Sequence, residues 1–103
     1  MRTVKLLISY DGTGYFGWQR QKTGPTIQAE IEHAVSIICN HSITVYGAGR
    51  TDAGVHALEM SAHFQTLSTV PCSKLVKGLN ALLPAQIRIL HAADHPENFH
   101  ARY

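Results

Sequence analysis

The segment from Gly47 to His56 holds the residues whose types and spacing are best suited to chemistry. It reads Gly-Ala-Gly-Arg-Thr-Asp-Ala-Gly-Val-His. Its glycines allow the backbone to come close to a ligand, and Arg50 stands two residues before Asp52. A guanidinium favours the ionised form of a nearby carboxylate, which is the form that a nucleophile requires. An Asp that caps a turn and pairs with a surface Arg would have the same spacing, so both interpretations stay open on this evidence.

Two common phosphate-binding loops do not fit this segment. Gly49 and Gly54 have the outer spacing of a Walker A loop, but Val55 and His56 follow where Lys and Ser or Thr are needed. Asp52 takes the place of the third glycine of a dinucleotide-binding loop. The segment therefore does not predict a nucleotide site of either kind.

A second glycine-rich segment, residues 11–24, interleaves aromatic and basic side chains. Aromatic rings stack on nucleic-acid bases, and cations hold phosphates. Because large aromatics such as Phe16 and Trp18 are usually mostly buried, Arg20 and Lys22 are the stronger candidates for contact with RNA.

The histidines and cysteines do not form a recognisable metal motif. His91, His95 and His100 lie close in sequence, but neither a Cys pair nor a helical His-x-x-x-His pattern with a Glu accompanies them. Cys39 and Cys72 are far apart, and we expect both to be buried thiols. No metal site is predicted.

The overall composition indicates one small globular domain. The chain has 103 residues, of which 45% are hydrophobic and 16% are charged, and its formal net charge is +2. These values exclude a disordered chain, and the slight positive charge permits a polyanionic partner without requiring one. No apolar run approaches the roughly 18 residues of a membrane helix, and the N-terminal apolar stretch is too short for a signal peptide. We therefore expect a cytoplasmic protein without a membrane partner.

Hydrophobic periodicity predicts four strands and two helices. The expected elements, in chain order, are a strand over 3–10, a helix from Pro25 to about residue 39, strands over 43–47 and 57–66, a helix between Pro71 and Pro84, and a strand over 87–91, followed by a turn-like tail over 94–98. The first helix places Gln28, Glu30, Glu32 and His33 off its apolar stripe.

This order predicts an α+β fold of the ferredoxin-like, split βαβ type (βαββαβ). It has a four-stranded antiparallel sheet with two helices on one face. The other face could be solvated, bind RNA or pack on another domain. Imperfect alternation on the strands favours a covered second face.

The segment Gly47–Ala57 resembles the signature of the tRNA pseudouridine synthase A family. Further matches occur in the family's order and extend the resemblance over nearly the whole chain: Tyr10–Gly12, Tyr15–Gln21, Leu79–Pro84 and Phe99–Arg102.

The resemblance implies an enzyme that converts uridine to pseudouridine in the anticodon stem-loop of tRNA, after flipping the base, without cofactor or metal. Asp52 matches the family's catalytic aspartate, which attacks either the uracil ring or the sugar. Arg50 matches the arginine that pairs with that aspartate and helps to hold the RNA open. The residue pattern already makes Arg20 and Lys22 candidates for RNA binding. His56, directly after the glycine-rich segment, could contact a substrate or cap the strand, and Arg102 lies in a stretch that matches the family.

Family members are usually more than twice as long, with a second, similar half and an active site in the cleft between the halves. The resemblance therefore implies that residues 1–103 are a single domain, the N-terminal half that carries the catalytic aspartate, and that the second half is absent. We expect little turnover from this half alone, and a homodimer for the full-length enzyme. The alternatives are a non-catalytic RNA-binding module of the same fold and a small phosphate-ester hydrolase.

Overall fold

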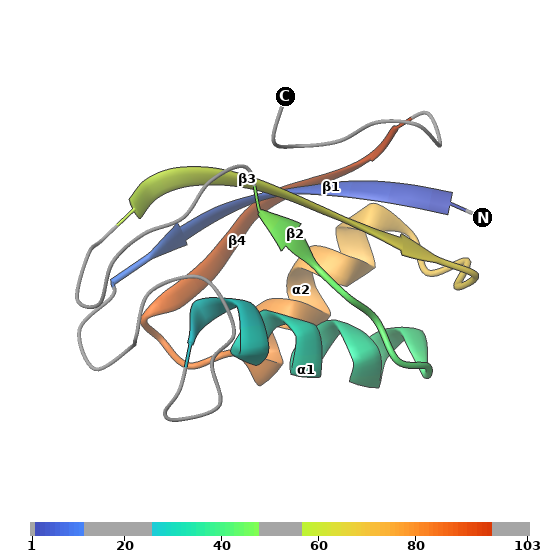
Figure 1. Ribbon diagram of the computed structural model, residues 1–103, viewed down its shortest axis with the longest axis horizontal. Helices are drawn as coiled ribbons and strands as arrows, with labels where there is room; N and C mark the ends of the chain where they lie inside the picture. The colour runs from blue at the N-terminus through green and yellow to red at the C-terminus, as the bar shows by residue number, and fades with distance from the viewer. Residues whose placement is uncertain (1, 12–25, 48–56, 96–103) are drawn as a thin grey trace.

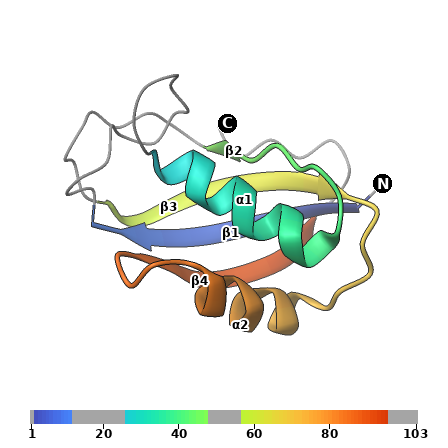
Figure 2. The same cartoon turned by 90° about the horizontal axis from the view of Figure 1, so that it is seen from below.

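The computed structural model describes residues 2–11, 26–47 and 57–95. Its elements are β1 (Arg2–Tyr10), α1 (Ile27–Cys39), β2 (Tyr46–Gly47), β3 (Ala57–Thr66), α2 (Cys72–Leu82) and β4 (Ile87–His95). The four strands form one sheet in the order β2-β3-β1-β4, and all three pairings are antiparallel. Both helices cover the same face of this sheet (Figures 1 and 2). The predicted α+β arrangement with four antiparallel strands and two helices is confirmed.

Helix α1 begins and ends with conventional capping residues. The hydroxyl Oγ1 of Thr26 accepts a hydrogen bond from the backbone N–H of Ala29 at 3.3 Å. Asn40 takes a left-handed conformation with φ 59°, which short polar residues adopt more readily than others. The apolar residues between these caps recur at helical spacing, so they form one stripe that packs toward the sheet.

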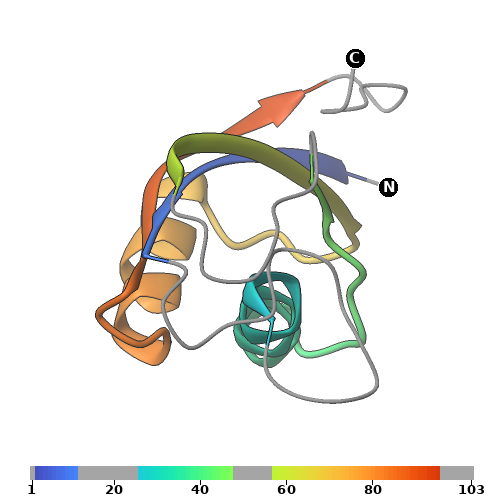
Figure 3. The same ribbon diagram turned by 60° about the vertical axis from the view of Figure 1, so that its left-hand side comes forward.

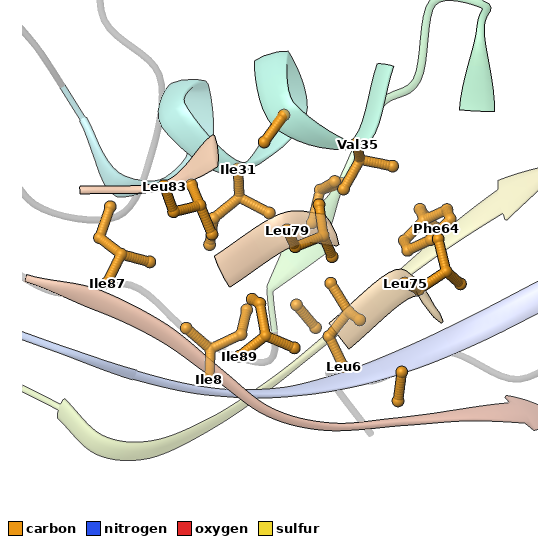
Figure 4. Close-up of a cluster of buried hydrophobic side chains, with 14 of the residues drawn as sticks. Leu6, Ile8, Ile31, Val35, Phe64, Leu75, Leu79, Leu83, Ile87 and Ile89 are labelled. Carbon is orange, nitrogen blue, oxygen red and sulfur yellow. The ribbon is translucent and has the colours of Figure 1, made fainter. Parts of the chain in front are cut away.

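Figure 3 shows the sheet and the two helices as separate layers, and the buried side chains drawn in Figure 4 fill the space between them. Its largest fully buried side chains include Phe64 of β3, Leu6 and Ile8 of β1, Ile31 of α1, and Leu79 of α2. Burying an aliphatic or aromatic side chain of this size contributes roughly 1.5–3 kcal/mol, so these contacts hold the helices on the sheet.

Strand β4 is longer than the sequence predicts and changes its alternation partway. The β1–β4 register shifts between Leu7, which pairs with His91, and Ile8, which pairs with Ile89. A bulge of this kind adds a residue to one strand and reverses the alternation beyond it, so Ala92 is buried and His91 is exposed. The expectation of a turn at 94–98 is wrong for Asp94 and His95, which belong to the strand; 96–98 lie outside the described residues.

Strand β2 is shorter than predicted. Only Tyr46 and Gly47 of the expected strand 43–47 pair with β3. Residues 43–45 lie outside the sheet because both backbone polar groups of Val45 bond to side chains of α1 instead.

The two cysteines differ in environment. Cys39 is a buried thiol, as predicted. Cys72 is only half-buried, and its Sγ accepts from Nη2 of Arg2 at 3.5 Å and donates to Oδ2 of Asp94 at 3.7 Å. Within the described ranges, no helix has the length and hydrophobicity needed to cross a membrane.

Candidate functional site

The predicted site residues lie in three segments outside the described part of the chain. Asp52, Arg50 and His56 fall within 48–56, Arg20 and Lys22 within 12–25, and Arg102 within 96–103. The structure does describe the residues that flank the first two segments at both ends. Those flanking residues define the frame of the site.

The residues just before segment 12–25 and just after segment 48–56 lie together at one end of the sheet. Tyr10, at the end of β1, pairs with Ala57, at the start of β3 (Figure 1). Segment 12–25 follows Asp11 directly, and segment 48–56 precedes Ala57. The pairing of β1 with β3 therefore brings the residue that precedes the Arg20 and Lys22 segment close to the residue that follows the Asp52 segment.

The end of β1 is fixed by contacts on both sides. The backbone N–H of Asp11 donates to the carbonyl of Gln86 at 2.9 Å, and Nε2 of Gln86 donates to the carbonyl of Asp11 at 3.2 Å. Tyr10 is buried, and its hydroxyl lies 3.7 Å from Sδ of Met60. This point of departure is thus tied to β3 and to the turn before β4.

The other end of segment 48–56 leaves the sheet at Gly47. Gly47 pairs with Ala62 of β3, and Ala62 also pairs with Leu6 of β1. The segment that contains Asp52 therefore starts beside the middle of β3 and returns at the beginning of the same strand.

The residue that precedes β2 is held by two side chains of α1. Nε2 of Gln28 donates to the carbonyl of Val45 at 2.7 Å, and the N–H of Val45 donates to Oε2 of Glu32 at 2.8 Å. Both side chains are buried, Gln28 being 8% and Glu32 7% exposed. Hydrophobic periodicity placed them off the apolar stripe and missed this role. The signal that would have found it is their four-residue spacing on a helix followed closely by an irregular segment.

The sheet face opposite the helices carries basic and aromatic side chains. A hollow of about 260 Å³ is lined by Lys5, Leu7, His91, Ala93 and His95. Lys5 pairs in register with Ala93 on one side and with His63 on the other, and the small Ala93 leaves space beside its long side chain.

On the other side of Lys5, the ring of Tyr46 stacks on His63 with centroids 5.3 Å apart and planes 22° apart. Tyr46 is 53% exposed, whereas His63 is buried. An ammonium group, imidazoles and an exposed aromatic ring are groups that can meet phosphates and bases.

A separate polar cluster lies at the start of β1 and is structural. Arg2 forms an ion pair with Asp94, and its Nη1 donates to the carbonyls of Ser68 at 3.0 Å and Val70 at 2.7 Å. The hydrogen bond from Arg2 lowers the pKa of Asp94 below its usual value. The cluster ties β1 and β4 to the connection that leads into α2.

Metal ligation has no support among the residues that the structure describes. No group of three or more His, Cys, Asp or Glu side chains in these ranges is placed to hold an ion. His91 and His95 line the hollow together with Lys5, whose ammonium is a donor and not a metal ligand.

Comparison with known proteins identifies the family. The family model described as "tRNA pseudouridine synthase" matches residues 6–103. The tRNA pseudouridine synthases A of Caldicellulosiruptor bescii and Syntrophotalea carbinolica are each 48% identical to this chain over 103 residues. Each match covers 100% of this chain, together with 42% of the Caldicellulosiruptor bescii protein and 41% of the Syntrophotalea carbinolica protein. The corresponding protein of Buchnera aphidicola is also 48% identical, with 100% of this chain and 39% of the relative covered. The chain thus spans about two fifths of the length of these curated relatives, and it belongs to the tRNA pseudouridine synthase family.

Proposed function

We propose that this chain is the part of a tRNA pseudouridine synthase that carries the catalytic aspartate, Asp52. The complete enzyme isomerises uridine to pseudouridine in the anticodon stem-loop of tRNA. The observation that carries the proposal is the 48% identity, over the whole chain, to relatives named tRNA pseudouridine synthase A.

The chemistry requires a nucleophile in a site that excludes water. The N1–C1′ bond of uridine breaks, a C5–C1′ bond forms, and the proton on C5 is replaced by one on N1, so the reaction is an isomerisation without oxidant or cofactor. Asp52 supplies the nucleophilic carboxylate, and Arg50 favours its ionised form. The target base must first be flipped out of the RNA, which costs a few kcal/mol, and contacts with the RNA backbone offset this cost.

The proposed tRNA-binding residues come from more than one element. Arg20 and Lys22 are proposed on the aromatic and basic pattern of segment 11–24, His56 on its place after the glycine-rich segment, and Arg102 on the resemblance. Lys5, His91 and His95 around the hollow on the open sheet face support an anionic partner from the structural side. A few phosphate contacts predict a log–log salt slope of roughly −2 to −3 for tRNA binding, at about −0.7 to −0.9 per contact.

The relatives' greater length supports a two-domain arrangement. We take residues 1–103 as one wall of the active-site cleft and the remainder of a relative-length protein as the other wall, in a cytoplasmic, homodimeric enzyme. The 103-residue chain alone is then expected to bind tRNA weakly and to turn over little of it.

The decisive experiment uses a chimera in which this chain replaces the matching 42% of the Caldicellulosiruptor bescii relative. The readout is tritium release from tRNA labelled at C5 of uridine. The chimera is expected to release tritium, and Asp52→Asn is expected to lower the rate by more than about 10⁴-fold, as loss of a nucleophile does.

The matched control is Asp94→Asn, because Asp94 is an exposed aspartate in the structural cluster with Arg2. Its rate is expected to stay within about two-fold of the parent, as for most surface substitutions. Equal rates for Asp52→Asn and the parent would overturn the assignment of the nucleophile. Tight tRNA binding without any tritium release would favour the RNA-binding module.

A further inference from the structure

We propose that three side chains of α1, namely Gln28, Glu32 and Ser36, are positioning residues for the segment that carries Asp52. They are called the α1 polar row below. The proposal rests on the proposed function, because a catalytic role for Asp52 is what makes the position of its segment matter.

The α1 polar row bonds to the backbone of two residues before β2, Ile43 and Val45. Ser36 Oγ accepts from the N–H of Ile43 at 3.0 Å, and Glu32 Oε2 accepts from the N–H of Val45 at 2.8 Å. Gln28 Nε2 donates to the carbonyl of Val45 at 2.7 Å. Since residues four apart lie on one face of a helix, the row runs along α1 antiparallel to the segment that it holds.

The row takes the place of a neighbouring strand. Ile43 and Val45 are buried, yet pairing with β3 begins only at Tyr46. A buried backbone N–H or C=O without a partner is costly, so a segment outside the sheet requires other partners. The α1 polar row provides them, and α1 thereby decides where the chain enters β2.

The entry into β2 is close in sequence to the proposed chemistry. Val45 is fixed by its buried side chain, its N–H and its carbonyl, and β2 follows immediately and leads into segment 48–56. Catalytic groups must be held within about 0.5 Å of the productive geometry, and a shift of about 1 Å costs on the order of 10²-fold in rate. Loss of one buried bond in the row is therefore expected to lower turnover more than tRNA affinity.

The first test measures amide hydrogen exchange in the 103-residue chain by NMR. In Glu32→Leu, the N–H of Val45 is expected to exchange about ten- to a hundred-fold faster, with a smaller increase at Tyr46 and Gly47. The N–H groups between β1 and β4 are expected to keep their rates. Glu32→Gln retains an acceptor oxygen and is expected to restore most of the protection.

Two further variants serve as a matched control and as a milder change within the row. Glu30→Leu makes the same change on the same helix but outside the row, and it is expected to leave Val45 protected. Ser36→Ala is a mild change that is expected to expose only the N–H of Ile43. Unchanged exchange at Val45 in Glu32→Leu, or equal acceleration throughout the sheet, would overturn the proposal. If Glu32→Leu does not fold, Ser36→Ala decides the test. An unchanged exchange rate for the N–H of Ile43 in that variant would then overturn the proposal.

The second test uses the chimera and separates kcat from KM. Glu32→Leu is expected to lower kcat by about 10- to 100-fold, with KM for tRNA within about two-fold, and Glu32→Gln is expected to recover most of kcat. Equal losses in Glu32→Leu and Glu30→Leu would show a general loss of stability and overturn the positioning role. A parent chimera without tritium release would instead overturn the proposed function, and amide exchange would then decide the structural role of the row by itself.

Discussion

The two edge strands of the sheet are held in different ways. Strand β4 pairs with β1 at eight positions over its nine residues, whereas β2 pairs with β3 at two positions within the described residues. The backbone ladder of β4 depends little on side-chain identity. The approach to β2 depends on the α1 polar row. The edge that leads to the proposed nucleophile is therefore the edge whose position depends on particular side chains.

A helix side chain also reaches the backbone of β4, and the comparison shows what each contact does. Asn80 of α2 accepts from the N–H of Ile89 at 2.8 Å and donates to its carbonyl at 3.0 Å. Ile89 already belongs to a paired strand, so Asn80 satisfies the groups on its outer side. Gln28 and Glu32 perform the same two functions for Val45, which pairs with no strand in the part of the chain that the structure describes. The same kind of contact supplements pairing at one edge and replaces it at the other.

The largest expected effect comes from a change that affects both edges. Phe64 of β3 is fully buried in the core that the two edges share (Figure 4). Phe64→Ala is expected to lower the free energy of unfolding by about 3–5 kcal/mol, as measured by urea denaturation. Amide exchange is expected to accelerate at both edges together. Acceleration at one edge alone would show that the edges are separate cooperative units.

The next effect is confined to the β4 side. Asn80→Ala removes both bonds to Ile89 and is expected to cost about 1–3 kcal/mol in the free energy of unfolding. In Asn80→Ala under native conditions, the N–H of Val45 is expected to remain better protected from hydrogen exchange than the N–H of Ile89. Lys77→Ala, at an exposed position of the same helix, serves as the control and is expected to change stability little.

A smaller effect is expected at the start of α1. Thr26→Ala removes the hydroxyl that caps the helix and is expected to cost about 1 kcal/mol in urea denaturation. Because α1 holds the approach to β2, exchange at Val45 is expected to accelerate more than exchange in β4. Equal acceleration at the two edges would contradict this. Thr69→Ala, at an exposed position between β3 and α2, is the matched control.

The stacked pair of Tyr46 and His63 tests β2 directly. Tyr46→Ala removes a cross-strand ring contact, and such pairs contribute roughly 0.2–1 kcal/mol. The expected result is faster exchange of the β2 amides, with little change in β4. Thr44→Ala, an exposed change two residues earlier, is expected to leave those amides unaffected.

The smallest effect concerns the Arg2–Asp94 pair and depends on pH. Because the hydrogen bond from Arg2 lowers the folded-state pKa of Asp94, the pair stabilises the fold above the unfolded value of 3.8. This contribution is lost as the pH falls through the lower folded value. Since Asp94 is 60% exposed, the difference between the parent and Asp94→Asn is expected to be a few tenths of a kcal/mol near neutral pH. Urea denaturation at several pH values is expected to show the two proteins converging at the acid end.

Sequence periodicity was sufficient for the order and type of the elements but not for three of their details. Apolar spacing reports which side chains are buried, and it predicted both helices and all four strands. It does not report where backbone groups find their partners, so it extended β2 back to residue 43 and placed Gln28 and Glu32 off the apolar stripe of α1. The bulge opposite Leu7 and Ile8 likewise depends on pairing with β1, which no local pattern within 87–95 contains.

The candidate site likewise has a part that the sequence predicted and a part that it did not. Asp52 and Arg50 were predicted from residue types, spacing and a family motif, and these assignments stay predictions because they fall outside the described ranges. The frame around them was not predicted, because a buried polar side chain that bonds to a distant backbone looks like a solvated one in sequence. A polar pair at four-residue spacing before an irregular segment is the pattern to look for.

Helix α1 is joined to both segments that hold most of the proposed site residues. Its cap, Thr26, follows segment 12–25 directly, and its polar row holds the chain just before β2 and segment 48–56. A helix of 13 residues behaves as a short rod, so any tilt of α1 against the sheet shifts the anchor points of both segments at once. The positions of Thr26 and Val45, which anchor the two segments, therefore both depend on α1. A movement of α1 that displaces one of them also displaces the other.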